Sequence, residues 1–184
     1  MPLAEALKIT AEEYRFLPEG GPRYQLIEGE LHMAPSPTEA HQDNAGNLFV
    51  IISVYLREHP IGKAFIAPFD VYLTEHDVYQ PDILYVSNRR RSIVEKTGVM
   101  GAPDFVVEVL SPSTARLDRT SKKKIYAAAG VPELWFIDPR RKTIEIFRLQ
   151  DDSEKPAKIH AANSVFTSPT FPGLKFRAAE IFRA

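Results

Sequence analysis

The sequence predicts an α/β or α+β fold with a central mixed β-sheet flanked by helices. Two patterns carry this prediction. Apolar residues between Leu48 and Leu56 repeat at the i, i+3, i+4 spacing of an amphipathic helix, whereas Pro103 to Leu110 is a short apolar run typical of a buried strand. Other helical and strand-like segments precede and follow these two. Because 184 residues suit one hydrophobic core, we expect a single domain over residues 1–184.

The first elements are short. Thr10 and Glu13 have the spacing of a capping box, which predicts a helix from Ala11 to about Phe16. Tyr24 to Met33 alternates as a strand does, with Glu28-Gly29-Glu30 as a turn or a bulge.

The amphipathic helix is expected from His41 to Glu58. Lys63 to Leu73 and Asp82 to Val86 are then expected to pair as strands, joined by a polar turn from Thr74 to Val78. Asn88 to Lys96 is highly charged, and we expect it to form an exposed arm.

After the central strand, Ser111 to Thr114 predicts a loop, and the following helix stops at Gly130. Glu133 to Asp138 and Lys142 to Leu149 predict a hairpin of two strands. The remainder of the chain suggests a short strand near Ile159 and a phenylalanine-rich cover.

Glu108 is the one carboxylate inside the apolar strand. A charged carboxylate without a partner in a dry interior costs several kcal/mol, so Glu108 must be paired, protonated or bound to a cation. In the next helix, Lys122 shares a face with Ile125, Tyr126 and Ala129, and its ammonium can therefore be drawn inward.

Asp82 follows a proline at the start of another strand. Two hard carboxylates, from Asp82 and Glu108, together with an inward lysine predict a site that binds Mg²⁺ and hydrolyses a phosphoester. His41, at the start of its helix, either packs locally or contacts the phosphate or a water. Glu28 is either an ordinary turn carboxylate or a third acid of the site, and we favour it over Glu30.

This combination resembles the PD-(D/E)XK, or restriction-endonuclease-like, superfamily. More closely, it resembles the bacterial branch usually labelled "putative restriction endonuclease". One position departs from the superfamily signature, because Leu110 stands where the lysine usually follows the acid, and Lys122 of the next helix takes that role. The closer match is carried by Tyr24 to Leu31, His41, Pro81-Asp82, Glu108 to Thr114, Asp118, Lys122, Tyr126 and Gly130 to Asp138.

The resemblance implies a Mg²⁺-dependent endonuclease, with Mn²⁺ as a possible substitute, that acts on nucleic acid and first of all on DNA. Asp82 and Glu108 would hold the metal with the backbone carbonyl of Val109, and Lys122 would orient water or neutralise charge. His41 and Glu28 would be accessory catalytic residues, and Tyr126 would position Lys122.

The composition leaves alternatives open. The absence of cysteine excludes thiolate catalysis and cysteine-ligated metals. The net charge of −1 does not indicate nucleic-acid binding, because domains that bind nucleic acid often carry a strongly basic face. Basic clusters at Arg89 to Arg91, Lys122 to Lys124 and Arg140 to Lys142 could meet phosphates or be solvated surface charge. The second reading is therefore a catalytically inactive module that binds nucleic acid or a partner protein, and the third is a hydrolase of another phosphoester.

No apolar stretch is long enough to span a membrane, and Met1 to Leu7 does not resemble a secretory signal. We therefore expect a cytoplasmic protein without membrane contact. A homodimer through the C-terminal phenylalanines is a further expectation, with packing onto the chain's own sheet as its alternative.

Overall fold

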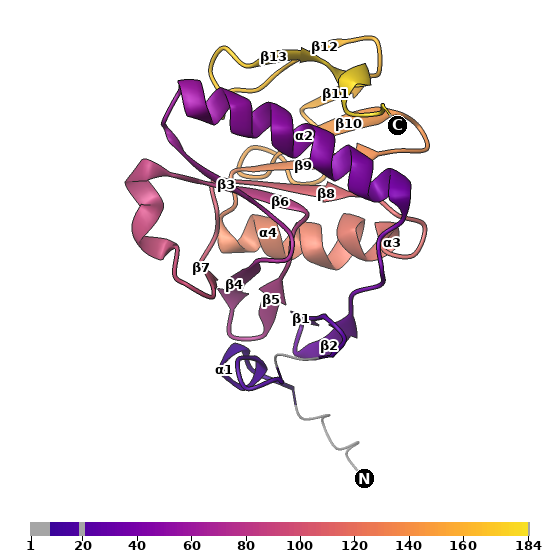
Figure 1. Ribbon diagram of the computed structural model, residues 1–184. Helices are drawn as coiled ribbons and strands as arrows, with labels where there is room; N and C mark the ends of the chain where they lie inside the picture. Colours follow the sequence, from indigo (N-terminus) through magenta and orange to yellow (C-terminus); the bar gives the residue numbers. More distant parts are fainter. Residues whose placement is uncertain (1–7, 19–20, 184) are drawn as a thin grey trace.

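The computed structural model describes residues 8–18 and 21–183. Met1 to Leu7, on which the expectation about a secretory signal rests, lie outside the described residues. Figure 1 shows a layered arrangement in which the long helix α2 (Glu39–Glu58) covers one face of a sheet and the helices α3 (Ala115–Leu117) and α4 (Lys123–Ala129) cover the other. This is the central mixed sheet flanked by helices that the sequence predicts.

The central sheet has six strands in the order β11-β10-β9-β8-β6-β3. Strand β8 pairs in parallel with β9 and antiparallel with β6, so the sheet is mixed. The expected hairpin and the expected strand near Ile159 are both present in it. Its strands are β3 (Gly62–Ile66), β6 (Ile83–Ser87), β8 (Phe105–Val109), β9 (Glu133–Asp138), β10 (Thr143–Arg148) and β11 (Lys158–Ala161).

A second sheet has five strands in the order β2-β1-β5-β4-β7 and lies below the first in Figure 1. The capping box of Thr10 and Glu13 is present at the helix α1 (Ala11–Tyr14) beside it. Strands β1 and β2 form a hairpin whose turn is Glu28-Gly29, and Glu30 begins β2. The strands are β1 (Tyr24–Ile27), β2 (Glu30–Met33), β4 (Asp70–Thr74), β5 (Asp77–Tyr79) and β7 (Gly98–Met100).

Two expectations about the middle of the chain are wrong. The predicted strand from Lys63 to Leu73 is two strands in different sheets, because the chain leaves the central sheet at Ala67 and Pro68, and Pro68 has no N–H to donate to a ladder. The segment Asn88–Ile93 is exposed as expected, since none of its residues is buried, but it is a short 3₁₀ helix, η1, and not an arm, because Arg90 lies 3.4 Å from Asp104.

The alternation of side chains along β8 divides the core. Phe105, Val107 and Val109 pack on the side of α2, whereas Val106 and Leu110 pack on the side of α4. Glu108 therefore points toward α4, which decides where the candidate site can form.

The C-terminal phenylalanines cover the sheet on the side of α2. Phe166 and Phe171 are fully buried and Phe176 is nearly so, in one cluster with Trp135. The expectation of a dimer through these residues is therefore replaced by its alternative, packing on the chain's own sheet. The cover contains β12 (Val165–Thr167), β13 (Lys175–Arg177) and the 3₁₀ helix η3 (Ala178–Glu180).

No helix in the described part of the chain is both long and apolar enough to cross a membrane.

Glu133 ties the C-terminal cover to the sheet. Its buried carboxylate accepts hydrogen bonds from Trp135 Nε1 at 2.6 Å, Ser168 Oγ at 3.0 Å and Thr170 Oγ1 at 2.9 Å. We expect Glu133→Ala to lower the free energy of unfolding by about 3 kcal/mol, because three donors lose their acceptor in the interior. Urea denaturation checks this, with the exposed Glu154→Ala as the control, and equal stability of the two variants would contradict it.

Candidate active site

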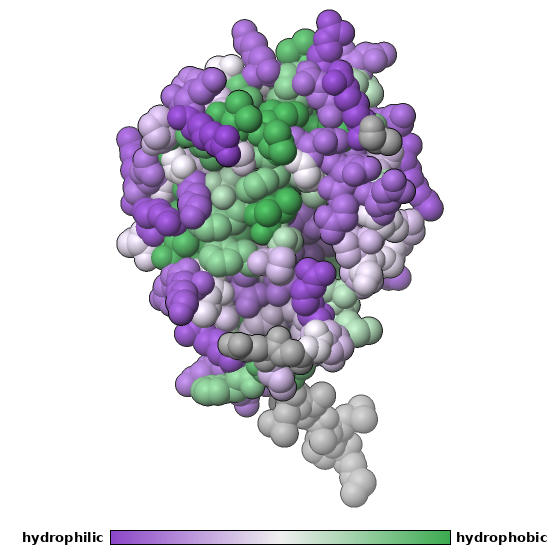
Figure 2. Space-filling view, in the orientation of Figure 1, coloured by the Kyte–Doolittle hydropathy of each residue, from purple (hydrophilic) through white to green (hydrophobic). Residues whose placement is uncertain are grey.

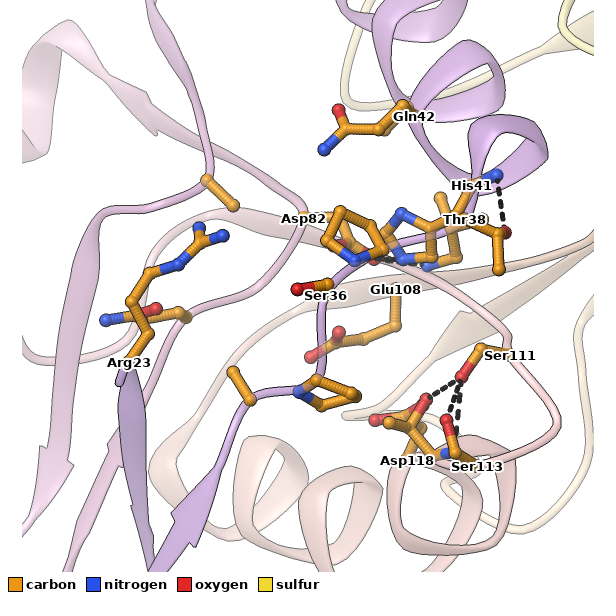
Figure 3. A pocket seen from close by; sticks show the side chains of 18 of the residues that line it. Arg23, Ser36, Thr38, His41, Gln42, Asp82, Glu108, Ser111, Ser113 and Asp118 are labelled. Carbon is orange, nitrogen blue, oxygen red and sulfur yellow. Dashed lines mark hydrogen bonds and ion pairs between the residues drawn. The ribbon is translucent and has the colours of Figure 1, made fainter. Parts of the chain in front are cut away.

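A pocket of about 330 Å³ opens where the start of β6, the end of β8 and the start of α2 meet. Figure 3 shows Glu108 in the middle of the pocket, Asp82 and His41 above it, and Asp118 below it and to the right. The loop before α2 and the loop after β8 form two of its walls. Of the residues predicted for the site, the structure brings Asp82, Glu108, Val109, Lys122 and His41 to this pocket.

Glu108 and Lys122 form a buried ion pair at the floor. The distance between Lys122 Nζ and Glu108 Oε1 is 3.1 Å, and both side chains are about 95% buried. Lys122 points inward, as its helical spacing predicts. The alternation of side chains along β8 turns Glu108 toward the same helical segment. The two side chains meet because strand and helix each present the required face.

A π-helical turn, η2 (Asp118–Lys122), joins α3 to α4 and carries a second acid. Asp118 Oδ1 lies 3.1 Å from Lys122 Nζ, and the side chain of Asp118 is 2% exposed. π-Turns inside α-helices are frequent at functional sites. One ammonium is thus shared by two buried carboxylates.

Asp118 is the site residue that reasoning from the sequence missed. It was not expected in the site, although it is one of the residues that carry the family resemblance and stands four positions before Lys122. That i, i+4 spacing places an acid and a base on one helix face, and it could have revealed the pair.

The predicted role of Tyr126 also needs correction. Its hydroxyl donates a hydrogen bond of 2.7 Å to Glu108 Oε1, the same oxygen that Lys122 contacts. Tyr126 therefore holds the carboxylate directly, and Lys122 Nζ lies 5.9 Å from the centre of the Tyr79 ring.

Asp82 bridges the strand and the helix on the other side of the pocket. Its Oδ2 accepts a hydrogen bond of 2.6 Å from the backbone N–H of Val109 and lies 3.2 Å from His41 Nε2. His41 is held in the first turn of α2, which Thr38 caps by accepting the His41 N–H. The side chains of Asp82 and His41 remain 16% and 18% exposed, so both face the opening.

The electrostatics of the pocket follow from its excess of acids. Burial raises the pKa of Glu108 to about 8; Lys122 opposes this rise, and the charges of Asp118 and Asp82 add to it. Burial would lower the pKa of Lys122, but the charges of Glu108 and Asp118 raise it above its usual value. Burial likewise opposes the charged form of His41, and Asp82 outweighs it, so the pKa of His41 is also raised.

Glu28 is not brought to the pocket. It stands in the turn between β1 and β2 with a φ of 52°, and its exposed side chain lies 3.4 Å from Ser121 Oγ. Asp118, and not Glu28, lines the pocket beside Asp82 and Glu108, and a catalytic role for Glu28 stays a prediction.

The three consecutive lysines do not form a surface cluster. Lys122 is buried, Lys123 is half-buried and lies 3.9 Å from Glu154, and Lys124 is exposed. A further basic residue of the pocket is Arg23, which Figure 3 shows across from Ser111 and Ser113.

The donor set fits a divalent cation. Asp82 and Glu108 offer hard carboxylate oxygens. The lining of the pocket holds three acids, Asp82, Glu108 and Asp118, together with Arg23, Lys122 and His41. No group of three or more metal-ligating side chains occurs among the described residues. Mg²⁺ commonly binds one or two carboxylates and keeps several waters, so two protein carboxylates suffice.

The comparisons with known proteins agree with this geometry. The model of the Uma2 family, described as "Putative restriction endonuclease", matches residues 11–179, so the chain belongs to this family and to the restriction-endonuclease-like superfamily. A search of curated proteins finds no match. Among solved structures, the chain is similar to one described as a "putative nuclease belonging to DUF820" from Anabaena variabilis ATCC 29413, with a TM-score of 0.79 and 24% identity over 95% of this chain and 97% of that one. At this identity the likeness shows the fold.

Replacing Lys122 tests the charge balance of the pocket. We expect Lys122→Met to lower the free energy of unfolding by about 3 kcal/mol at pH 8, because two buried carboxylates lose their shared counter-charge. The loss should shrink at pH 5, because a carboxyl with a raised pKa takes up a proton and needs no counter-charge.

Urea denaturation in EDTA at the two pH values measures this effect. Lys124→Met, on the exposed side of the same helix, is the control and should behave as the wild type does. An equal loss for Lys122→Met at both pH values would show that packing, and not charge, sets the cost.

Proposed function

We propose that the protein is a Mg²⁺-dependent endonuclease that hydrolyses phosphodiester bonds of nucleic acid, with DNA as the first substrate to test. One observation carries the proposal: the ammonium of Lys122 reaches Glu108 from the following helix, in the same pocket that Asp82 faces. Family membership supports the class of enzyme, and the arrangement of acids and lysine supports metal-assisted hydrolysis.

Asp82, Glu108 and the backbone carbonyl of Val109 would hold the cation. When bound, Mg²⁺ would lower the pKa of water and polarise the phosphate. Lys122, fixed by Glu108 and Asp118, would orient the attacking water or neutralise charge that develops on the phosphate. His41 would place a second positive charge at the pocket opening, because Asp82 favours its protonated form.

Calorimetric titration with Mg²⁺ and Mn²⁺ tests the metal ligands. Wild type should bind either ion, whereas Glu108→Ala and Asp82→Asn should bind at least about tenfold more weakly, because each loses an anionic carboxylate ligand. Glu30→Gln removes an exposed carboxylate at the start of β2 and should bind as wild type does. Absence of binding at millimolar metal in the wild type would leave an inactive binding module as the better account.

Cleavage of plasmid and of single-stranded DNA tests the reaction. We expect Lys122→Ala to keep much of the metal binding but to lose nicking by about a hundredfold or more, since Lys122 acts on the water and phosphate. Lys124→Ala should nick at the wild-type rate. Metal binding without cleavage of DNA or RNA, but with hydrolysis of a small phosphodiester, would instead support a hydrolase of another phosphoester.

A further inference from the structure

Among residues 8–18 and 21–183, no element covers the outer face of α2, although this face is not a typical polar helix surface. Val50 and Val54 are 60% and 49% exposed, one helical turn apart. Figure 2 shows apolar side chains gathered over the middle of this helix, with hydrophilic ones around them. The inner face of the same helix buries Leu48 and Ile52 against the sheet, so the outer valines are a second apolar stripe.

Gly46 continues this stripe, and packing among the described residues does not require a glycine there. A Cβ built at Gly46 would meet nothing within 4 Å, so no neighbouring group of the protein requires glycine there. Glycine is unfavourable in the interior of a helix. It is useful where another backbone approaches closely.

Opposite charges end the stripe. Asp43 and Arg57 lie on the same face as Val50, seven residues before and seven after it. Neither takes part in an ion pair among the described residues. The outer stripe of α2, defined as Asp43, Gly46, Val50, Val54 and Arg57, is therefore acidic at one end, apolar in the middle and basic at the other.

We propose that the outer stripe of α2 binds the same stripe of a second copy of this chain, with the two helices antiparallel. A two-fold axis through Val50 brings Asp43 opposite Arg57 of the partner subunit. It also brings Val54 opposite Gly46 of the partner subunit, where the missing side chain leaves room. Charge and size thus match at every pair of the stripe, as a self-complementary two-fold interface requires.

This pairing is independent of the proposed nuclease activity. The occupant is a second copy of this chain because the stripe is complementary to itself in charge and in side-chain size. A surface that binds an unrelated partner does not need this self-complementarity.

Sedimentation equilibrium at tens of micromolar protein measures the association. The wild type should have about twice the mass of the 20.8 kDa chain. Val50→Glu should weaken dimerisation on the order of a hundredfold, because two carboxylates meet on the two-fold axis in place of apolar contact. Val165→Glu is the matched control, since Val165 is 56% exposed and lies on β12. Circular dichroism confirms that both variants fold.

The charged ends allow a swap. Asp43→Arg and Arg57→Asp should each weaken the dimer, because each creates like charges across the interface, and the double variant should restore it. A structural effect within one chain would not be rescued in this way. Failure of the double variant to recover would overturn the proposed register.

Cross-linking tests the position of the axis. The chain contains no cysteine, so Val50→Cys introduces a single thiol. Across a two-fold axis the two thiols can approach to disulfide distance, and a cross-linked dimer should form rapidly under mild oxidation. Lys124→Cys, exposed on α4, should cross-link far more slowly. A monomeric wild type, or a dimer that Val50→Glu leaves intact, would overturn the proposal.

Discussion

The contact between Glu108 and Lys122 is the constraint on which the site depends. A carboxylate in the middle of a buried strand is costly unless charged and neutral donors satisfy it. Lys122 and Tyr126 do so through the same oxygen, and both come from the helical segment that packs on this face. The Glu108 carboxylate, which would bind the metal, therefore also fixes the helical segment to the sheet. The stability of the fold and the candidate function depend on the same contact.

The same geometry explains why Leu110 can stand where the superfamily signature has a lysine. Leu110 lies two residues after Glu108, on the same face of the strand, and packs in the apolar cluster beneath α4. A lysine there and a lysine at position 122 would approach the same carboxylate from different elements. Moving the ammonium to the helix lets Asp118 share it, which binds η2 to the floor of the pocket. The superfamily's chemistry can thus be retained while the strand position becomes apolar.

Much of this fold could be predicted because its signals are local. Each of these signals depends on residues close together in the sequence: the capping box at Thr10, the apolar periodicity of α2 and the lone acid in the apolar strand β8. The path of the chain at Pro68 could not be predicted in this way, because strand-like residues do not specify which sheet they join. The place of Asp118 in the pocket could not be predicted for a related reason: a carboxylate's position in the sequence does not tell whether a π-turn directs it inward.

Helix α2 connects the candidate site to the rest of the molecule. Its first turn holds His41 beside Asp82, and its inner face packs on the central sheet through Leu48 and Ile52. The position of His41 relative to Asp82 therefore depends on how firmly the whole helix is seated. A partner on the outer stripe would hold the helix from the opposite side, since a packed helix moves as a unit. Self-association through α2 would in this way restrict the motion of His41 without contributing any residue to the pocket.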